Sequence, residues 1–289
     1  MKQIKKRPTE VFGYDCDANL NEKAFKLAIK QQYYRHIKST CVKPRKSEPA
    51  IKVGICSLGA SMANDRTMKP IIICPQRFKE DSVFEEVRQK YLSHWKNVKW
   101  ISEVNIGVGG SVDYVAVEIG KNGEIKDFLC VELQAAGTTG SPYPAVQEII
   151  NSGKFKSDTY NYGINWANEF SKTMMQQAYK KGKILESWKR KIVFVVQDVA
   201  IDYLKIATDC SLLMKSDKKL PVDFCTFKMV WNNDKNWNLV FDNIYSTSIE
   251  GINLMLGGAA VNEYLTEEEF IANIIKKGIA DGILNRNDY

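Results

Sequence analysis

The sequence predicts an α/β fold in which helices flank a mixed central sheet. The first observation is an amphipathic helical pattern over residues 80–95, followed by three runs with the composition of β-strands. Between the second and third runs stands Asn122-Gly123, the dipeptide most typical of a tight hairpin turn. A second helical pattern over residues 165–181 then precedes a short apolar run at residues 191–197, which is typical of a buried central strand.

The first helix and the strand after it follow from the spacing of apolar side chains. The apolar side chains that fall near one helical face are Val83, Phe84, Val87, Tyr91 and Leu92. Residues 98–108 then have the composition of a strand, and Gly109-Gly110 ends it. We therefore expect a helix followed directly by a strand.

Two apolar runs, residues 112–117 and 128–134, are expected to pair as the hairpin. Side chains on a strand alternate between the two faces of the sheet, so Glu132 and Gln134 project to the same side. Pairing of the two strands brings Asp113, on the first run, beside them. The hairpin is therefore expected to gather two carboxylates and one amide on a sheet.

The second half of the chain carries further helix signals. Asn165 is the expected N-cap of the helix over residues 165–181, and Gly182 is its expected stop. Near the C-terminus, Thr266 precedes three glutamates at 267–269, and acidic side chains suit the positive end of a helix. We therefore expect a C-terminal helix to begin there.

The chain divides by composition near residue 78. Residues 1–78 contain four of the seven cysteines, a basic segment at residues 43–46 and little regular periodicity. Residues 79–289 contain the regular helix and strand patterns. We expect residues 1–78 to form a small cysteine-rich region that binds a metal ion and contacts DNA, and residues 79–289 to form the α/β core.

Charge and composition narrow the class of protein. The 289 residues can bury a full core, and 41 Lys and Arg against 34 Asp and Glu favour polyanionic partners. No apolar stretch approaches the length of a membrane span, and no apolar segment follows the basic N-terminus. We therefore expect a cytoplasmic protein without a membrane partner, in which an odd number of cysteines indicates free thiols or metal ligation.

The acidic residues of the hairpin suggest a divalent cation. Glu103 lies on the preceding predicted strand, so a third carboxylate can reach Asp113 and Glu132. Carboxylates that are buried without a partner are costly, and such a group needs a compensating cation. The alternative is that Asp113 and Glu132 face solvent on the polar side of an amphipathic hairpin.

The order of Asp113, a hairpin and Glu132-Leu133-Gln134 is similar to the PD-(D/E)xK nuclease signature, with glutamine where a lysine is most common. More specifically, the chain resembles restriction endonucleases of the NotI and EagI type, up to about Asp198. The matching segments are Phe12-Gly13-Tyr14, Cys41-Val42-Lys43, Val53-Gly54-Ile55-Cys56, Ile73-Cys74-Pro75-Gln76-Arg77, Glu103, Asp113, Glu132-Leu133-Gln134 and Gly163-Ile164-Asn165-Trp166-Ala167-Asn168.

The resemblance implies a PD-(D/E)xK core and a type II site-specific deoxyribonuclease, which makes sequence-specific double-strand cuts in DNA by Mg²⁺-dependent hydrolysis. It assigns Asp113 and Glu132, with the carbonyl of Leu133, to hold Mg²⁺ through oxygen ligands. Gln134 would orient the attacking water but cannot supply the positive charge of a lysine. Glu103 would bind a second ion or a water, with Glu86 as the alternative residue for that position.

The resemblance also implies a four-cysteine metal fold ahead of the core. Cys41, Cys56 and Cys74 match its second, third and fourth ligands. Where the family carries a Cys-Pro pair, this chain has Gln31-Gln32-Tyr33-Tyr34, so the first ligand is open between Cys16 and His36. The family implies iron, and tetrahedral thiolates accept zinc equally well. The alternative is that these cysteines are small buried hydrophobic residues.

The expected partner is double-stranded DNA. Arginine pairs with guanine in the major groove, so Arg45, Arg66 and Arg77 are candidate base readers, the alternative being a solvated basic face. Cutting both strands at a palindrome calls for two copies of one active site, so a homodimer is expected. The competing functions are a repair or conflict nuclease without strict sequence specificity, and a non-enzymatic cysteine-metal DNA-binding protein.

Overall fold

A computed structural model of the chain describes residues 2–19, 22–45, 48–62, 65–107, 110–232, 234–257, 267–281 and 286. The residues outside these ranges include Lys46 in the basic segment, Val108 and Gly109 at the predicted strand end, and Thr266 before the C-terminal helix. The helices are α1 (Cys16–Asn19), α2 (Lys23–Gln31), η1 (Pro75–Lys79, 3-10), α3 (Asp81–Tyr91), α4 (Tyr143–Ser152), η3 (Ala167–Met174, π), α5 (Met175–Ser187), α6 (Asp198–Ala207), α7 (Ile249–Gly257) and α8 (Glu267–Ala280).

The strands divide between an N-terminal group and the main sheet. The N-terminal strands are β1 (Pro8–Val11), β2 (Tyr14–Asp15), β3 (Tyr33–Tyr34), β4 (Ser39–Thr40), β5 (Pro44–Arg45), β6 (Glu48–Lys52), β7 (Ile55–Met62) and β8 (Asp65–Ile72). The strands that follow are β9 (Val98–Asn105), β10 (Ser111–Ile119), β11 (Ile125–Gln134), β12 (Thr138–Thr139), β13 (Gly163–Ile164), β14 (Ile192–Gln197), β15 (Met214–Lys215), β16 (Val222–Trp231) and β17 (Trp237–Thr247).

The main sheet is mixed, as the sequence predicts. Within the described residues its strands run in the order β15-β17-β16-β14-β11-β10-β9. Strands β11, β14 and β16 are parallel, whereas β9, β10, β15 and β17 pair antiparallel with their neighbours. The predicted hairpin is confirmed, because β10 and β11 pair antiparallel and Gly123 in the turn has φ 85°. The predicted central strand is β14, which begins one residue later than predicted, and every residue of β14 is buried.

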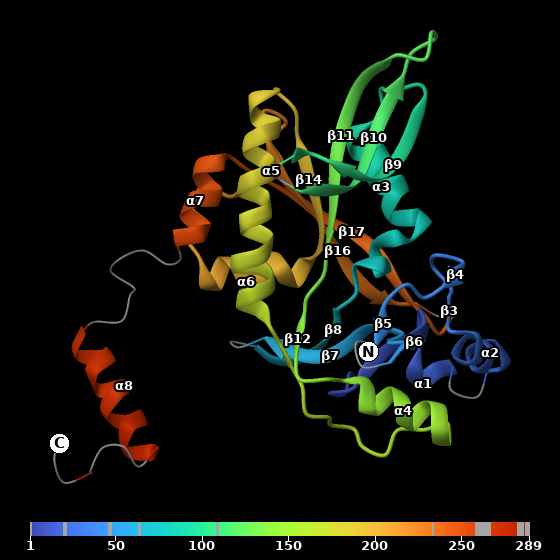
Figure 1. Ribbon diagram of the computed structural model, residues 1–289, viewed down its shortest axis with the longest axis vertical. Coiled ribbons are helices and arrows are strands. Elements are labelled where there is room, and N and C mark those ends of the chain that lie inside the picture. The colour runs from blue at the N-terminus through green and yellow to red at the C-terminus, as the bar shows by residue number, and fades with distance from the viewer. Residues whose placement is uncertain are drawn as a thin grey trace.

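Helices cover both faces of this sheet (Figure 1). Along β14, Phe194 belongs to a buried cluster that includes residues of α5, α6 and α7, whereas Val193 and Val195 belong to a second cluster with residues of α3. This alternation is the period of two that a strand buried on both faces requires. Among the described residues, the helices do not include one that is long and apolar enough to cross a membrane.

Four of the N-terminal strands form their own antiparallel sheet, in the order β2-β1-β7-β8, which lies beside one end of the main sheet (Figure 1), whereas β3 pairs with β4 and β5 pairs with β6. The side-chain amide of Gln197, at the end of β14, joins the two sheets: its Oε1 accepts from the Ile72 N–H at 2.8 Å and its Nε2 donates to the Pro70 carbonyl at 2.7 Å. Ala136, just beyond β11, donates to the Ile72 carbonyl at 3.0 Å. The carboxyl ends of β11 and β14 therefore contact β8.

Two predictions about the helices were imprecise. Helix α3 ends at Tyr91, four residues before the predicted end at Trp95. Gly182 does not stop the next helix but lies within α5. A Cβ atom at Gly182 would lie 2.7 Å from Val222 Cγ2 and 3.0 Å from Ile249 Cδ1. The glycine is therefore explained by close packing of α5 against its neighbours.

The prediction that Arg77 reads bases is wrong, because its side chain is 0% exposed. Its Nε lies 2.9 Å from Glu10 Oε2, its Nη1 pairs with Glu80, and its Nη2 donates to the Trp237 carbonyl at 2.9 Å. Burial opposes its charge, but Glu10 and Glu80 raise the pKa of Arg77 above its ordinary value. The guanidinium thus links β1, η1 and β17.

Replacing Arg77 is expected to destabilise the protein rather than change its sequence preference. Arg77→Met leaves the buried Glu10 carboxylate without its cation, which costs about 3–5 kcal/mol of unfolding free energy. Thermal or urea unfolding measures this loss. The matched control is Arg66→Met, because Arg66 is exposed and should change stability by less than about 0.5 kcal/mol. An Arg77→Met protein as stable as the wild type would contradict the structural role.

Candidate active site

The hairpin brings Asp113 and Glu132 together. The pairing of β10 with β11 includes Tyr114 opposite Val131, so one step further along the register Asp113 lies beside Glu132. Asp113 Oδ2 accepts a hydrogen bond of 2.8 Å from the Leu133 N–H. The Asp113 N–H also bonds to the Glu132 carboxylate. Each of the two carboxylates therefore accepts a hydrogen bond from a backbone N–H of the neighbouring strand.

The Glu132 carboxyl is buried, with 5% of the residue exposed. Burial raises the pKa of Glu132 to about 7, and the charge of Asp113 acts in the same direction. The hydrogen bond and positive charge of Lys181, together with the Asp113 N–H, act in the opposite direction. The carboxyl thus lies where its negative charge is costly and where a cation relieves the cost.

Lys181 on α5 is the cation that faces Glu132, and the sequence prediction missed it. Its Nζ lies 2.6 Å from Glu132 Oε1 and 2.7 Å from the Ser111 carbonyl oxygen, and the residue is only 4% exposed. A signal was present in the sequence, because Lys181 falls in the buried stripe of α5 with Ala178 and Leu185. A lysine in an apolar helical stripe is rarely buried without a partner.

Glu103 lies on the other side of Asp113. Strand pairing places Val104 opposite Val112 and Ser102 opposite Tyr114, so Glu103 comes opposite Asp113. Glu103 has φ 56°, in the left-handed region, which costs of order 1–3 kcal/mol for a residue with a side chain. Such strain is often found at functional sites.

Glu103 and Asp113 line the same small cavity of about 50 Å³. Its other lining residues are Pro75, Gln76, Lys79, Tyr114 and Leu133. Glu132 does not line this cavity, because its carboxylate is directed at Lys181. Glu86, the alternative to Glu103, is also absent from the lining. Asp113 is therefore the acidic residue common to the cavity and to the contact with Glu132.

Gln134 lies two residues beyond Glu132 on β11. Its side-chain Nε2 donates to the Ala135 carbonyl at 3.1 Å. The amide carries no charge, so the positive charge beside Glu132 comes from α5 and not from β11. Gln134 is nevertheless on the strand face that Glu132 occupies, as the alternation of side chains predicts.

The acidic pair fits a small divalent cation by the chemistry of its donors. Magnesium prefers oxygen ligands and is usually held by one or two carboxylates together with waters and phosphate oxygens. Asp113 and Glu132 supply two such carboxylates, and burial, with a smaller effect of the Asp113 charge, raises the pKa of Glu132. Among the described residues no three His, Cys, Asp or Glu side chains are grouped to hold a metal ion, so Glu103 does not complete a three-carboxylate site.

The four N-terminal cysteines are all buried and free of disulfides. Cys16 begins α1, Cys56 lies on β7, Cys74 precedes η1, and Cys41 follows β4. Burial raises the pKa of Cys56, and the negative charges of Cys74 and Cys41 add to this effect. Among the residues that the structure describes, no three of these side chains are grouped to hold a metal ion.

His36, the alternative first ligand, has a different partner. Its Nδ1 lies 3.1 Å from Glu80 Oε1. Burial, with the positive charges of Arg77 and Arg35, lowers the pKa of His36 to about 2. The imidazole is therefore neutral, and it belongs to the same buried network as Arg77. Cys16, by contrast, is close enough to Cys56 for the charge of that thiol to affect it.

The two remaining candidate base readers lie on the N-terminal strands. Arg45 on β5 pairs with Glu48 at 2.6 Å, and its guanidinium lies 4.5 Å from the centre of the Tyr143 ring. Arg66 on β8 is exposed. Both side chains are therefore accessible in part, and their contact with bases stays a prediction.

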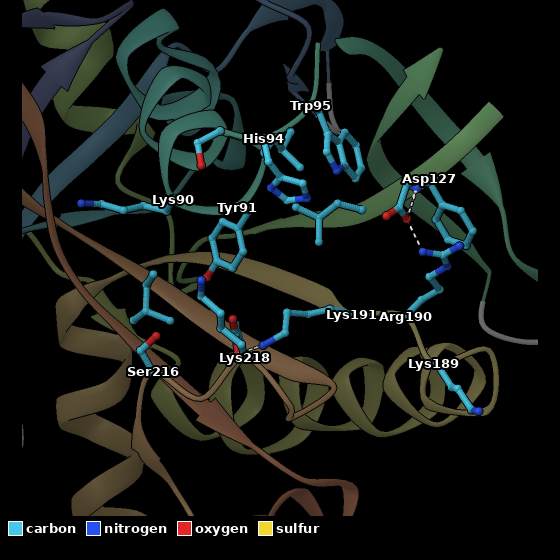
Figure 2. A pocket seen from close by; sticks show the side chains of 16 residues that line it. Lys90, Tyr91, His94, Trp95, Asp127, Lys189, Arg190, Lys191, Ser216 and Lys218 are labelled. Atoms are coloured by element: carbon cyan, nitrogen blue, oxygen red, sulfur yellow. Dashed lines mark hydrogen bonds and ion pairs between the residues drawn. The ribbon is translucent and has the colours of Figure 1, made fainter. Parts of the chain in front are cut away.

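A second hollow, of about 340 Å³, is lined by residues of α3, β11, β16 and β17 and of the segments beside them, and Figure 2 shows its side chains from close by. Its labelled basic side chains are Lys90, Lys189, Arg190, Lys191 and Lys218. Its acidic side chains are already paired, Asp127 with Arg190 and Asp223 with Lys191. Asp127 precedes Glu132 by five residues on β11, which is about 17 Å along a strand. This hollow is therefore separate from the acidic pair.

A comparison with known proteins identifies the family. The family model described as "Restriction endonuclease NotI" matches residues 32–207, which is more than half of the chain and includes β9 to β11 and α5. No curated protein matches the chain. The family acts on DNA and includes site-specific nucleases of the type II class. The chain therefore belongs to the NotI restriction endonuclease family and is a type II site-specific deoxyribonuclease.

Proposed function

We propose that this endonuclease hydrolyses DNA by a Mg²⁺-dependent reaction at Asp113 and Glu132. The single observation that supports this proposal is the direct contact of the two carboxyl-bearing strands, in which Asp113 Oδ2 accepts from Leu133 and Glu132 accepts from the Asp113 N–H. The strand–hairpin–strand arrangement of these residues is the one expected for a PD-(D/E)xK core. Residues 79–289 would form that core.

Asp113 and Glu132 would hold the Mg²⁺ ion, together with the carbonyl of Leu133. A magnesium ion bound there supplies positive charge to the phosphate and makes a water more acidic. Gln134 can rotate away from the Ala135 carbonyl and orient a water through its amide, as an acceptor or a donor. Positioning of the water and phosphate at fixed groups contributes a large part of such catalysis.

The cavity beside Asp113 suits the approach of a DNA phosphate. Lys79 and Glu103 both line it. The Lys79 ammonium would contact a phosphate oxygen, since lysine binds phosphate as a point charge. Glu103 would accept a hydrogen bond from a water at the mouth of the cavity. The left-handed backbone of Glu103 would direct its carboxylate into this cavity.

Neutralising either acidic residue is expected to stop cleavage. Asp113→Asn and Glu132→Gln remove the negative charge that holds the cation, and kcat should fall about 100-fold or more while affinity for DNA stays within about threefold. Plasmid cleavage with Mg²⁺ and a DNA-binding assay without it measure the two effects. The matched control is Glu118→Gln on β10, whose carboxylate accepts one exposed hydrogen bond from the backbone N–H of Lys96. Wild-type cleavage by either site variant would refute the proposed ligand set.

We also propose that the active form is a homodimer. Cutting both strands of a palindromic site needs two copies of the active site in twofold relation, and one chain carries one Asp113–Glu132 pair. Sedimentation of the pure protein should therefore give twice the chain mass of 32.9 kDa. A species of the single-chain mass that still makes double-strand breaks in one binding event would contradict the dimer.

A structural iron or zinc ion in the N-terminal region is proposed on the chemistry of its thiols. Cys41, Cys56 and Cys74 are buried in the same region, and burial together with the nearby charges of Glu10, Cys74 and Cys41 raises the pKa of Cys56. Cys16 is the preferred fourth ligand, since the Cys56 thiol affects its pKa. Residues 1–78 would then gain folding free energy from the metal. Arg45 and Arg66 in this region would contact DNA.

Metal analysis tests this ion directly. About one equivalent of tightly bound iron or zinc per chain is expected, and Cys56→Ser should abolish it, because a hydroxyl is a poor ligand for either metal. Inductively coupled plasma spectrometry measures the content. The matched control is Cys225→Ser on β16, a buried cysteine of the main sheet that should leave the metal content unchanged. Much less than one equivalent in the wild-type protein would refute the site.

A further inference from the structure

Lys181 is a buried cation to which the proposed reaction gives no role. Its Nζ donates to Glu132 Oε1 at 2.6 Å, to the Ser111 carbonyl at 2.7 Å and to Gln177 Oε1 at 3.5 Å. An ammonium has three N–H donors, and these acceptors use all of them. With 4% of the residue exposed, the contacts are shielded from water. Lys181 is therefore held in one place rather than free to sample solvent.

Lys181 contacts both strands of the hairpin that carries Asp113 and Glu132. Ser111 begins β10 and stands two residues before Asp113, whereas Glu132 lies on β11. One side chain from α5 therefore fixes the position of Glu132 and of the strand that carries Asp113. Breaking a buried ion pair leaves an uncompensated charge and is strongly unfavourable, so the arrangement is rigid.

The positive charge beside Glu132 comes from Lys181 on α5, whereas the neighbouring side chain of β11 on the same face is neutral. Gln134 is the nearby side chain on the same face as Glu132, and its amide is neutral and bonded to Ala135. A lysine at position 134 would stand two residues from Glu132 on one strand face. Here the charge comes from a helix 49 residues further along the chain.

We propose that Lys181 is a positioning residue of the active site. Through Glu132 and the Ser111 carbonyl it holds the two acidic side chains in the arrangement that cleavage requires. The proposal rests on the proposed function, because it takes Asp113 and Glu132 as the groups that hold the cation. Lys181 itself contacts neither substrate nor reacting atoms in this role.

The first test measures the pairing of Lys181 with Glu132 without metal or DNA. Lys181→Met and Glu132→Gln each leave one buried charge unpaired, so each should lower the melting temperature by about 6 °C or more. The double variant removes both charges and should melt within about 3 °C of the wild type. If the double variant melts as low as the two single losses added together, the two residues do not act as a pair.

The second test measures cleavage of plasmid DNA with Mg²⁺. Lys181→Met should lower kcat about 100-fold while KM for DNA stays within about threefold, because displaced groups lose the reactive geometry and not the binding surface. A purely structural role of Lys181 would instead lower the folded fraction and leave kcat per folded molecule unchanged. The matched control is Lys180→Met, an exposed neighbour on α5 that should behave as wild type.

The outcomes separate the two proposals. If Glu132→Gln cleaves at the wild-type rate, the proposed function is wrong. If Glu132→Gln is inactive but Lys181→Met keeps kcat within threefold of the wild type, the positioning role is wrong and the proposed function stands. Should Lys181→Met not fold, Lys181→Arg keeps the charge with a different donor geometry, and about a tenfold loss of kcat is expected. An unchanged kcat in a folded Lys181→Arg protein would overturn the positioning role.

Discussion

The ion pair between Glu132 and Lys181 is the interaction on which the arrangement of the candidate site depends. An ionised carboxylate on a buried strand is costly unless a cation and hydrogen-bond donors compensate it. Lys181 provides this compensation from α5, and the Asp113 N–H adds a donor from β10. Helix α5 is in turn held close to its neighbours at Gly182, where a larger residue would meet Val222. The position of Glu132 is thus determined by the packing of a helix.

The site lies at the end of the main sheet that contacts the N-terminal strands. The side-chain amide of Gln197, at the end of β14, both accepts and donates a hydrogen bond with the backbone of β8. The Ala136 N–H, just beyond β11, donates to the Ile72 carbonyl. The segment matched by the NotI family model includes both regions, from residue 32 to residue 207. The basic side chains of β5 and β8 and the acidic pair therefore belong to connected parts of one structure. This connection is what a nuclease needs if one region contacts DNA and the other cuts it.

Local sequence was sufficient to predict Asp113 and Glu132 as neighbours. A hairpin with an Asn-Gly turn has a defined register, and alternation along each strand then decides which side chains share a face. Glu103 follows from its place on the preceding predicted strand, and it comes opposite Asp113 in the register of β9 and β10, but the sequence does not predict its left-handed backbone. The prediction of Arg77 as a base reader is wrong, because the presence of a positive charge in the sequence does not show whether the side chain points to solvent or into the core. Its guanidinium turns inward to Glu10, a residue 67 positions earlier in the chain.

The sequence by itself determined the mixed α/β class, the hairpin and the central strand β14, because these follow from short-range periodicity and turn residues. It also predicted that Asp113 and Glu132 meet, since these two residues lie on the two strands of the hairpin. Only the tertiary structure decided that Lys181 faces Glu132, that Arg77 is buried, and that Gly182 lies inside a helix. Each of these depends on contacts between segments that are far apart in the chain, which local patterns do not specify. Burial then sets the charge balance of the site, because the cost of a charge depends on what surrounds it.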